Sequence, residues 1–427
     1  MNIYANGDEQ MKVHILLLPL SFYLLCAFHQ VHAGSKWLDE YIQEALDSNR
    51  EILSARLATS AAQQENQLYS TLPDPTFMIE GRAIPLDLHV RDTRELMFMF
   101  EQMIPAPGVL KRMQKSGEFA ADIQAEMGRA VENDIMSRVK SLYSHLYYVD
   151  QALASNKKHL QLLDEIEEIA ESSYIVNASG QQALYQIRIE KARLQADSLS
   201  LQQQRRSKQA EMNRLLKLPL DGHVPTDSAL VMPNFPFKIN VDSLLELSNP
   251  FLRAAKIGTA ASENAVMLAR ARGLPALQLM GGYMLMNDMD DAVMGRISVT
   301  LPFMPWANAD SRAASARSQI LARQSALDYE ILLDKLRVKF ITAQNELAAL
   351  LSQIDLYRNV ILPASARTVR LSVAAYQSNS LDFISLVQYA RQDLQNQLAQ
   401  IELSSQYLRT WAELENIIGQ SIRGDLE

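Results

Sequence analysis

Most of the chain carries apolar residues at the three- and four-residue spacing of an amphipathic helix. The longest such segment runs from about Val109 to Tyr174, and another runs from about Asn308 to Tyr376 with an interruption only at Pro363. At 1.5 Å per residue, a helix of about sixty residues is roughly 100 Å long, about three times the diameter of an ordinary domain. Such helices are predicted to pack lengthwise on one another.

Each long helix is predicted to end in a polar turn and to return as a second helix, to Leu218 in the first case and over Phe383–Ile418 in the second. The first turn is Asn177, Ala178, Ser179 and Gly180, and the second is Asn379, Ser380, Leu381 and Asp382. Shorter helices are predicted over Trp37–Leu68 and over Val241–Ala271, the latter broken near Asn249-Pro250.

Four short segments alternate apolar and mixed positions with a period of two, which is the pattern of a strand with one apolar face. They are predicted at Thr76–Leu86, Glu95–Ile104, Leu277–Met286 and Ala292–Leu301. Pro105 and Pro107 follow the second strand, and Pro302 and Pro305 follow the fourth. Because proline interrupts regular hydrogen bonding, each strand pair is predicted to turn directly into a long helix.

The same plan occurs twice, at an offset of about 200 residues. Tyr174–Gln186 matches Tyr376–Gln388 at four positions, and Ser48-Asn49 corresponds to Ser248-Asn249. A repeat of this length is far longer than a solenoid unit, so it indicates an internally duplicated domain. The predicted organisation is a signal peptide at 1–33, a first repeat at 34–218, a linker at 219–240 and a second repeat at 241–427.

The N-terminal segment has the layout of a secretory signal. Lys12 precedes the apolar stretch Ile15–Phe28, and Ala33 ends a small-residue cleavage site. The apolar stretch is too short to span a membrane as a retained helix. Cys26, the single cysteine, lies inside the signal after Leu25. We therefore expect neither a lipid anchor nor a disulfide in the mature chain.

The order helix, strand hairpin, proline turn, very long helix, polar turn and helix, given twice, resembles the TolC-like outer-membrane efflux proteins. Gln102–Gly108 is similar to their strand-end motif, and Ser248-Asn249-Pro250 is similar to their Asn-Pro helix break. Leu184 and Leu386 follow the two turns as the family pattern requires. The resemblance covers nearly all of residues 37–420.

The resemblance implies a mostly α protein with a membrane β-barrel part. Three identical chains would each lend four strands to a twelve-stranded barrel and their helical hairpins to a periplasmic tunnel. Four strands with an apolar outer face cannot close a barrel alone, and open sheet edges are not tolerated in lipid. The implied function is a passive duct in the outer membrane of a Gram-negative-type cell, with a periplasmic adaptor, an inner-membrane pump and no cofactor.

Two departures from the family pattern concern the hairpin tips. Relatives often carry Gly then Arg in the turn that meets the adaptor, whereas this chain has the two turn sequences given above. Aspartates that some relatives place at the inner aperture correspond to Ser385 and Gln388. The resemblance therefore leaves open which adaptor is recognised and what the aperture selects.

Charge and motif content exclude several functions. The net charge of −8 comes with no basic stripe, so a nucleic-acid partner is not expected. The seven histidines are scattered, and His145 has no second histidine one helical turn away. Gly281-Gly282 lies inside a predicted strand and not in a phosphate-binding loop. We therefore expect a protein that moves solutes and not an enzyme.

One face of the predicted strands is rich in methionine. If Phe77, Phe98 and Tyr283 face lipid, the alternate positions face the lumen. These are Met78, Glu80, Arg82, Met97, Met99, Glu101, Met103, Met280, Met284, Met286 and Met294. Thioether sulfur is a soft ligand suited to Cu(I) or Ag(I), which favours export of heavy-metal cations. Methionine also fills irregular space in a core, so a packing role remains an alternative and metal binding stays unknown.

Other functions compatible with part of the pattern are a type I secretion or drug-export channel, a periplasmic adaptor and a coiled-coil scaffold. An adaptor should have one helical hairpin beside a small β-rich carrier domain, whereas this chain has two hairpins and four amphipathic strands. A scaffold needs no strands. The export channel accounts for all of these elements.

Overall fold

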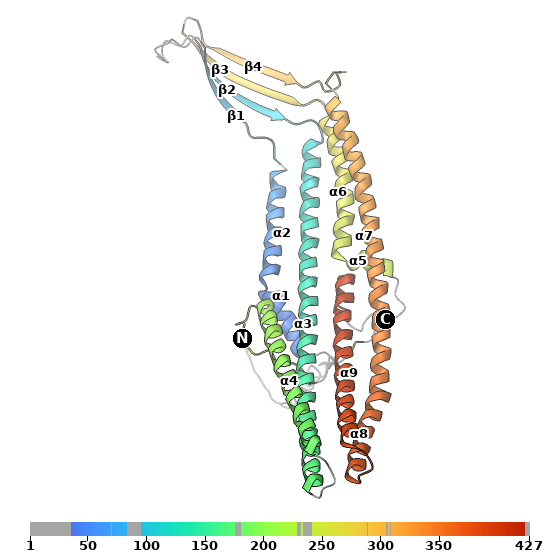
Figure 1. The fold of residues 1–427 in the computed structure, drawn as a ribbon. Helices are drawn as coiled ribbons and strands as arrows, with labels where there is room; N and C mark the ends of the chain where they lie inside the picture. Colours follow the sequence, from blue (N-terminus) through green and yellow to red (C-terminus); the bar gives the residue numbers. More distant parts are fainter. Residues whose placement is uncertain are drawn as a thin grey trace, which may run out of the picture.

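The computed structural model describes residues 36–69, 71–82, 95–175, 181–228, 232–233, 241–287, 289–304, 306–307 and 309–422. The predicted signal peptide, residues 83–86 of the first predicted strand, the first polar turn at Asn177–Gly180 and part of the predicted linker lie outside these residues. The molecule is an elongated bundle of helices with one β-sheet at its end (Figure 1).

The two halves of the chain contain the same succession of elements. In the first half these are α1 (Lys36–Ser48), α2 (Arg50–Leu68), β1 (Thr76–Arg82), β2 (Glu95–Ile104), α3 (Val109–Ile175) and α4 (Gln181–Leu216). In the second half they are α5 (Val241–Ser248), α6 (Pro250–Arg272), β3 (Leu277–Met286), β4 (Ala292–Val299), α7 (Ala309–Leu356), the π-helical turn η2 (Tyr357–Ile361), α8 (Leu362–Gln377) and α9 (Phe383–Ile418). The mostly helical fold with four strands is thus confirmed.

The elements differ from the sequence-based expectation at one helix break and at some of their ends. The helix predicted over Trp37–Leu68 is broken at Asn49, as its counterpart is at Asn249. The fourth strand ends at Val299 and not at Leu301, and the first return helix ends at Leu216 and not at Leu218. The interruption predicted at Pro363 in the long helix of the second half is confirmed, because η2 lies just before this proline. In that position a proline lacks the N–H for the helical hydrogen bond and its ring crowds the carbonyl one turn earlier.

Both helix breaks are built around a buried asparagine. The Asn49 side chain accepts hydrogen bonds from the amides of Glu51 and Ile52, and its Nδ2 donates to the Leu215 carbonyl at 2.9 Å. The Asn249 side chain accepts from the Leu252 amide at 2.8 Å, and its Nδ2 donates to the carbonyl of residue 417 at 2.7 Å. Each asparagine therefore caps the helix leading to the sheet and ties it to the end of the return helix.

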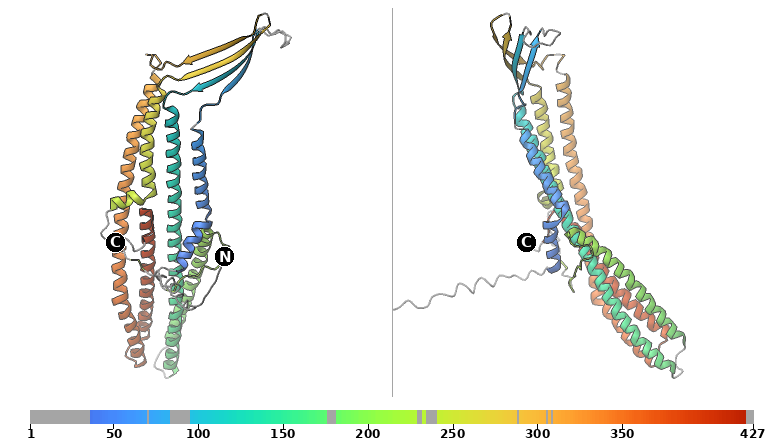
Figure 2. Two further views of the ribbon diagram at one scale, coloured as in Figure 1. Left: turned by 180° about the vertical axis from the view of Figure 1, so that it is seen from behind. Right: turned by 90° about the vertical axis from the view of Figure 1, so that its left-hand side faces the viewer.

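The strands form a single antiparallel sheet in the order β1-β2-β3-β4. Since β2 belongs to the first half and β3 to the second, their pairing from Glu95↔Met286 to Ile104↔Leu277 joins the two repeats. Figure 2 shows the sheet at one end of the molecule and the helical hairpins at the other.

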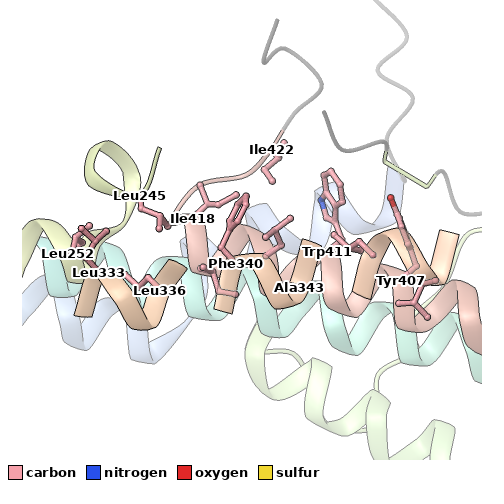
Figure 3. Close-up of a cluster of buried hydrophobic side chains, with 14 of the residues drawn as sticks. Leu245, Leu252, Leu333, Leu336, Phe340, Ala343, Tyr407, Trp411, Ile418 and Ile422 are labelled. Atoms are coloured by element: carbon pink, nitrogen blue, oxygen red, sulfur yellow. The ribbon is translucent and has the colours of Figure 1, made fainter. Parts of the chain in front are cut away.

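The core consists of separate clusters along the bundle instead of one central core. Ile52, Val139 and Leu215 belong to the cluster of the first half. Leu252 and Phe340 belong to that of the second half, which Figure 3 shows between α5, α6, α7 and α9. The distribution fits helices that pack lengthwise, because each level of the bundle must bury its own apolar stripe.

Candidate functional site

The sheet has one apolar face that the described part of the chain leaves exposed. Val293 is 82% exposed and Ile297 is 73% exposed, although both lie inside β4. Further apolar side chains of this face that are more than a third exposed are Phe77, Ile79, Phe100, Leu277, Leu279, Tyr283, Leu285 and Val299. A contiguous exposed apolar surface of this kind marks contact with lipid or with another protein.

The strand register places the predicted lumen-facing residues together on the other face. Four rows cross the sheet from β1 toward β4, after a first row of Met103, Gln278 and Ser298 at the end nearest the helices. They are Thr76, Glu101, Met280 and Arg296; Met78, Met99, Gly282 and Met294; Glu80, Met97, Met284 and Ala292; and Arg82, Glu95 and Met286. We call this surface the methionine face. Met97 is fully buried and Met99 is 5% exposed, whereas Met103 is 50% exposed, so this face is shielded from solvent mainly along the middle of β2.

The absence of a side chain at Gly282 lets its neighbours approach closely at the middle of the methionine face. A Cβ atom there would stand 2.7 Å from the Phe98 carbonyl oxygen, 3.0 Å from Met99 Cγ and 3.4 Å from Met294 Cγ. The two methionines therefore lean over the glycine from the strands on either side. Sequence reasoning treated this glycine only as a strand residue, because the neighbours across the sheet are far apart in the chain.

Charged residues lie at both ends of the methionine face. Near the helices, Glu101 accepts a hydrogen bond from the Gln278 amide. At the far end, Arg82 Nε donates to Glu80 at 3.0 Å, and Arg82 approaches Glu95 at 3.9 Å. The methionines of the two middle rows, Met78, Met97, Met99, Met284 and Met294, thus lie between two polar zones.

The second hairpin turn, predicted as Asn379, Ser380, Leu381 and Asp382, is described and lies at the end of the bundle remote from the sheet. Asn379 has a φ of +58°, a left-handed conformation that asparagine tolerates. Asp382 caps α9 and accepts from the Ser385 amide at 3.0 Å and from its hydroxyl at 2.7 Å. The Ser385 hydroxyl, followed by backbone amides, lowers the pKa of Asp382. The turn therefore carries a negative charge that is held in place.

The tips of the two hairpins are packed together. Ala183 and Ile187 from α4 share a buried cluster with Tyr376, Phe383 and Leu386 from the second hairpin. This contact places the start of α4 beside the second hairpin (Figure 1). Of the predicted aperture residues, Ser385 is engaged in the helix cap and Gln388 is exposed.

An ion pair between the hairpins was missed by sequence reasoning. The Arg391 Nε and Nη2 atoms donate to both carboxylate oxygens of Glu190, at 2.7 Å and 2.5 Å, so the pair is bidentate. Glu190 is buried on α4, and the carboxylate raises the pKa of Arg391. Gln186, Gln388 and this pair line one groove of about 350 Å³. No sequence signal identifies such a pair, because it depends on which faces of α4 and α9 meet.

The candidate sites contain no conventional metal cluster. Within the ranges that the structure describes, no group of three or more His, Cys, Asp or Glu residues is placed to hold a metal ion. Thioethers are therefore the ligands to consider at the methionine face.

No described helix is both long enough and apolar enough to cross a membrane.

Comparison with known proteins identifies the fold. No protein-family model and no curated protein sequence matches the chain. Several solved structures match it over nearly its whole length. The structure of CusC, described in connection with transmembrane channel formation, is similar with a TM-score of 0.77 and 18% identity, over 90% of this chain and 92% of that one.

Two further structures have the same likeness. The Neisseria gonorrhoeae MtrE outer membrane channel, in its open state, matches with a TM-score of 0.76 and 16% identity, over 92% and 91% of the two chains. The Campylobacter jejuni CmeC outer membrane channel matches with a TM-score of 0.75 and 13% identity, over 92% and 88%. At these identities the likeness establishes a TolC-like channel fold.

Proposed function

We propose that this chain is one subunit of an outer-membrane export channel, a homotrimer that forms a passive duct from the periplasm to the exterior. The exposed apolar face of the sheet carries the proposal. In water this face would be a costly surface, whereas in a bilayer it matches its surroundings. The TolC-like fold supports the same function, because the similar structures are described as membrane channels.

The edges of the sheet explain why the channel needs several copies. Within the described residues, β1 and β4 each pair on one side only. Unpaired backbone groups are not tolerated in hydrocarbon, so the edge strands must meet strands of other chains. Three copies would supply a closed ring of twelve strands with the methionine face toward its lumen.

The hairpin tips are the proposed contact with a periplasmic adaptor and an inner-membrane pump. The tips lie at the far end of the bundle from the lipid-facing sheet, where a periplasmic partner can reach them. Contact residues would come from Asn177, Ala178, Ser179, Gly180, Asn379, Ser380, Leu381 and Asp382, with Ser385 and Gln388 near the inner aperture. Crosslinkers at Ser179 or Ser380 should then capture an envelope protein, and mid-helix crosslinkers should not.

The proposed cargo includes heavy-metal cations. The observation that favours them over drugs or secreted proteins is the methionine face, where soft thioethers outnumber charged groups. A channel specialised for organic compounds or polypeptides has no need of sulfur ligands in its lumen.

A pair of substitutions on one strand tests the membrane location. Ile297 and Ser298 are neighbours in β4 and point to opposite faces. Arginine on the lipid face of a membrane strand costs roughly 2–4 kcal/mol near the bilayer midplane, whereas lumen positions tolerate it. We expect Ile297→Arg to lower the yield of outer-membrane trimer several-fold and Ser298→Arg to leave it unchanged. Equal tolerance of both changes would contradict the proposal, since a water-exposed Ile297 would accept arginine freely.

A further inference from the structure

We infer that the methionine face contains a thioether site for a soft monovalent metal ion, formed by Met78, Met99 and Met294 around Gly282. These four residues occupy one row across all four strands. The site deepens the proposed export function and rests on it, because the ion would meet these side chains only while passing through the duct.

The geometry of the row brings the side chains of Met99 and Met294 close to each other over Gly282. Met99 and Met294 lie on strands that are not neighbours, about 10 Å apart at a spacing of about 4.8 Å per strand. Gly282 between them has no side chain, and both Cγ atoms lie within 3.4 Å of the point where its Cβ would be. Met78 is the direct cross-strand partner of Met99. Three flexible thioethers can therefore converge over the glycine without any movement of the backbone.

The chemistry of the row selects the type of ion. Soft thioether ligands favour Cu(I) and Ag(I), whereas Mg²⁺, Ca²⁺ and Mn²⁺ prefer carboxylate and carbonyl oxygen. The row contains no carboxylate, and Met99 is almost completely shielded from water. A hard, strongly hydrated cation would gain nothing there.

Methionines in the adjacent rows provide successive sites. Met97 and Met284 face each other one row farther from the helices, and Met280 and Met286 lie in the rows beyond on either side. Rows on one face are two residues apart, or roughly 7 Å. Conduction requires binding that is weak and repeated, because a single tight site would trap the ion. A ladder of neutral thioethers meets that requirement.

Silver binding to the purified full-length protein in detergent tests the site. Ag(I) nitrate is titrated by calorimetry, and X-ray absorption identifies the atoms around the metal. The variants are Met78→Leu, Met99→Leu and Met294→Leu, alone and together, because leucine keeps the volume but removes the sulfur. The matched control is Met267→Leu, a partly exposed methionine on α6.

We expect Ag(I) in the wild type to have only sulfur neighbours from the protein. Each single variant should weaken binding at this row on the order of tenfold, and Met267→Leu should bind as the wild type does. The triple variant should bind less silver than the wild type by the amount held at this row, because the adjacent rows keep their methionines. Silver binding by the triple variant with wild-type affinity and stoichiometry, or no binding by the wild type, would overturn the site and return these methionines to a packing role.

Conductance of the same preparations in planar bilayers separates this inference from the proposed function. Open channels combined with a lower silver stoichiometry in the triple variant than in the wild type support both. If the wild type conducts but does not bind silver, the metal site is refuted and the export function is not. Silver binding without any channel supports the site and refutes the export function.

Discussion

The two long hairpins follow one plan, yet only the second is interrupted. In the first half, α3 runs for 67 residues from the sheet to the tip. In the second half, the equivalent path passes from α7 through η2 into α8. A π-helical turn with a nearby proline gives up regular hydrogen bonds. The second hairpin therefore has a point of lower local stability that the first lacks, so bending of the second hairpin should occur there.

The two return helices end in the same kind of turn, but the second half is stricter about which residue can occupy it. Lys217 and Gly419 correspond at the repeat offset, and both have left-handed φ values of 58° and 89°. A Cβ at Gly419 would stand 2.5 Å from the Ser248 carbonyl oxygen and 2.8 Å from Asn249 Cα. The Lys217 side chain is exposed to solvent, so the turn in the first half has room for a Cβ atom. The same turn thus needs glycine only at residue 419, where the backbone of the helix break approaches this closely.

Replacing Gly419 with alanine should have the largest effect on this comparison. The left-handed conformation costs an L-residue roughly 1–2 kcal/mol, and crowding of backbone atoms adds roughly 1–3 kcal/mol. We expect the free energy of unfolding to fall by roughly 2–5 kcal/mol, measured from urea-induced unfolding followed by tryptophan fluorescence. Trp411 lies in the adjacent cluster and reports on it. A change below about 0.5 kcal/mol would mean that the turn and the helix break are not in close contact.

Replacing Asn49 and Asn249, the buried asparagines of the two helix breaks, tests whether both halves depend equally on these side chains. Asn49→Ala and Asn249→Ala each remove a helix cap worth about 1 kcal/mol and leave a buried carbonyl unpaired at a cost of roughly 1–3 kcal/mol. Both variants should lose roughly 2–4 kcal/mol in the same urea experiment. Ser48→Ala is the matched control for the first break, because its hydroxyl bonds are partly exposed. A lower free energy of unfolding in only one asparagine variant would show that the two helix breaks contribute differently to stability.

Replacing Pro363 with alanine should make the second hairpin resemble the first. Alanine can donate the missing backbone hydrogen bond, which contributes about 1 kcal/mol net. Amide hydrogen exchange at residues 357–361 should therefore slow on the order of tenfold, toward the rates of the matching part of α3. The control is exchange at residues 340–350 of α7, which should not change. Unaltered exchange at residues 357–361 would mean that packing of neighbouring side chains, and not Pro363, causes the π-helical turn η2.

The smallest expected effect is a gain in stability in the first half. Lys217→Gly removes the cost of a left-handed lysine, and the net gain should be about 0.5–1 kcal/mol after the entropic cost of glycine. Lys217→Ala, which keeps a Cβ, should give no such gain. A decrease in stability with glycine would show that the lysine side chain makes a stabilising contact of its own.

The pattern of apolar positions alone determined much of the architecture. Uninterrupted helical periodicity fixed the length of α3, since no residue in it forces an end, and period-two alternation fixed β2 and β3 to their terminal residues. The duplication was visible in the sequence because corresponding positions of the two halves carry the same residues, such as Asn49 and Asn249, which make corresponding hydrogen bonds. The parity of the methionines was also readable, because side chains alternate strictly along a strand. That the methionine face lines a lumen stays a prediction.

Only the tertiary structure decided which residues meet. The break at Asn49 escaped notice because asparagine also occurs within helices, and its role depends on the Leu215 carbonyl far along the chain. The convergence of Met99 and Met294 depends on the pairing of β2 with β3, which belong to different repeats and are joined by no local turn. The Glu190–Arg391 ion pair likewise requires a particular rotation of α4 against α9. Periodicity states which face of an element is apolar, whereas the partner of that face is set by packing over the whole molecule.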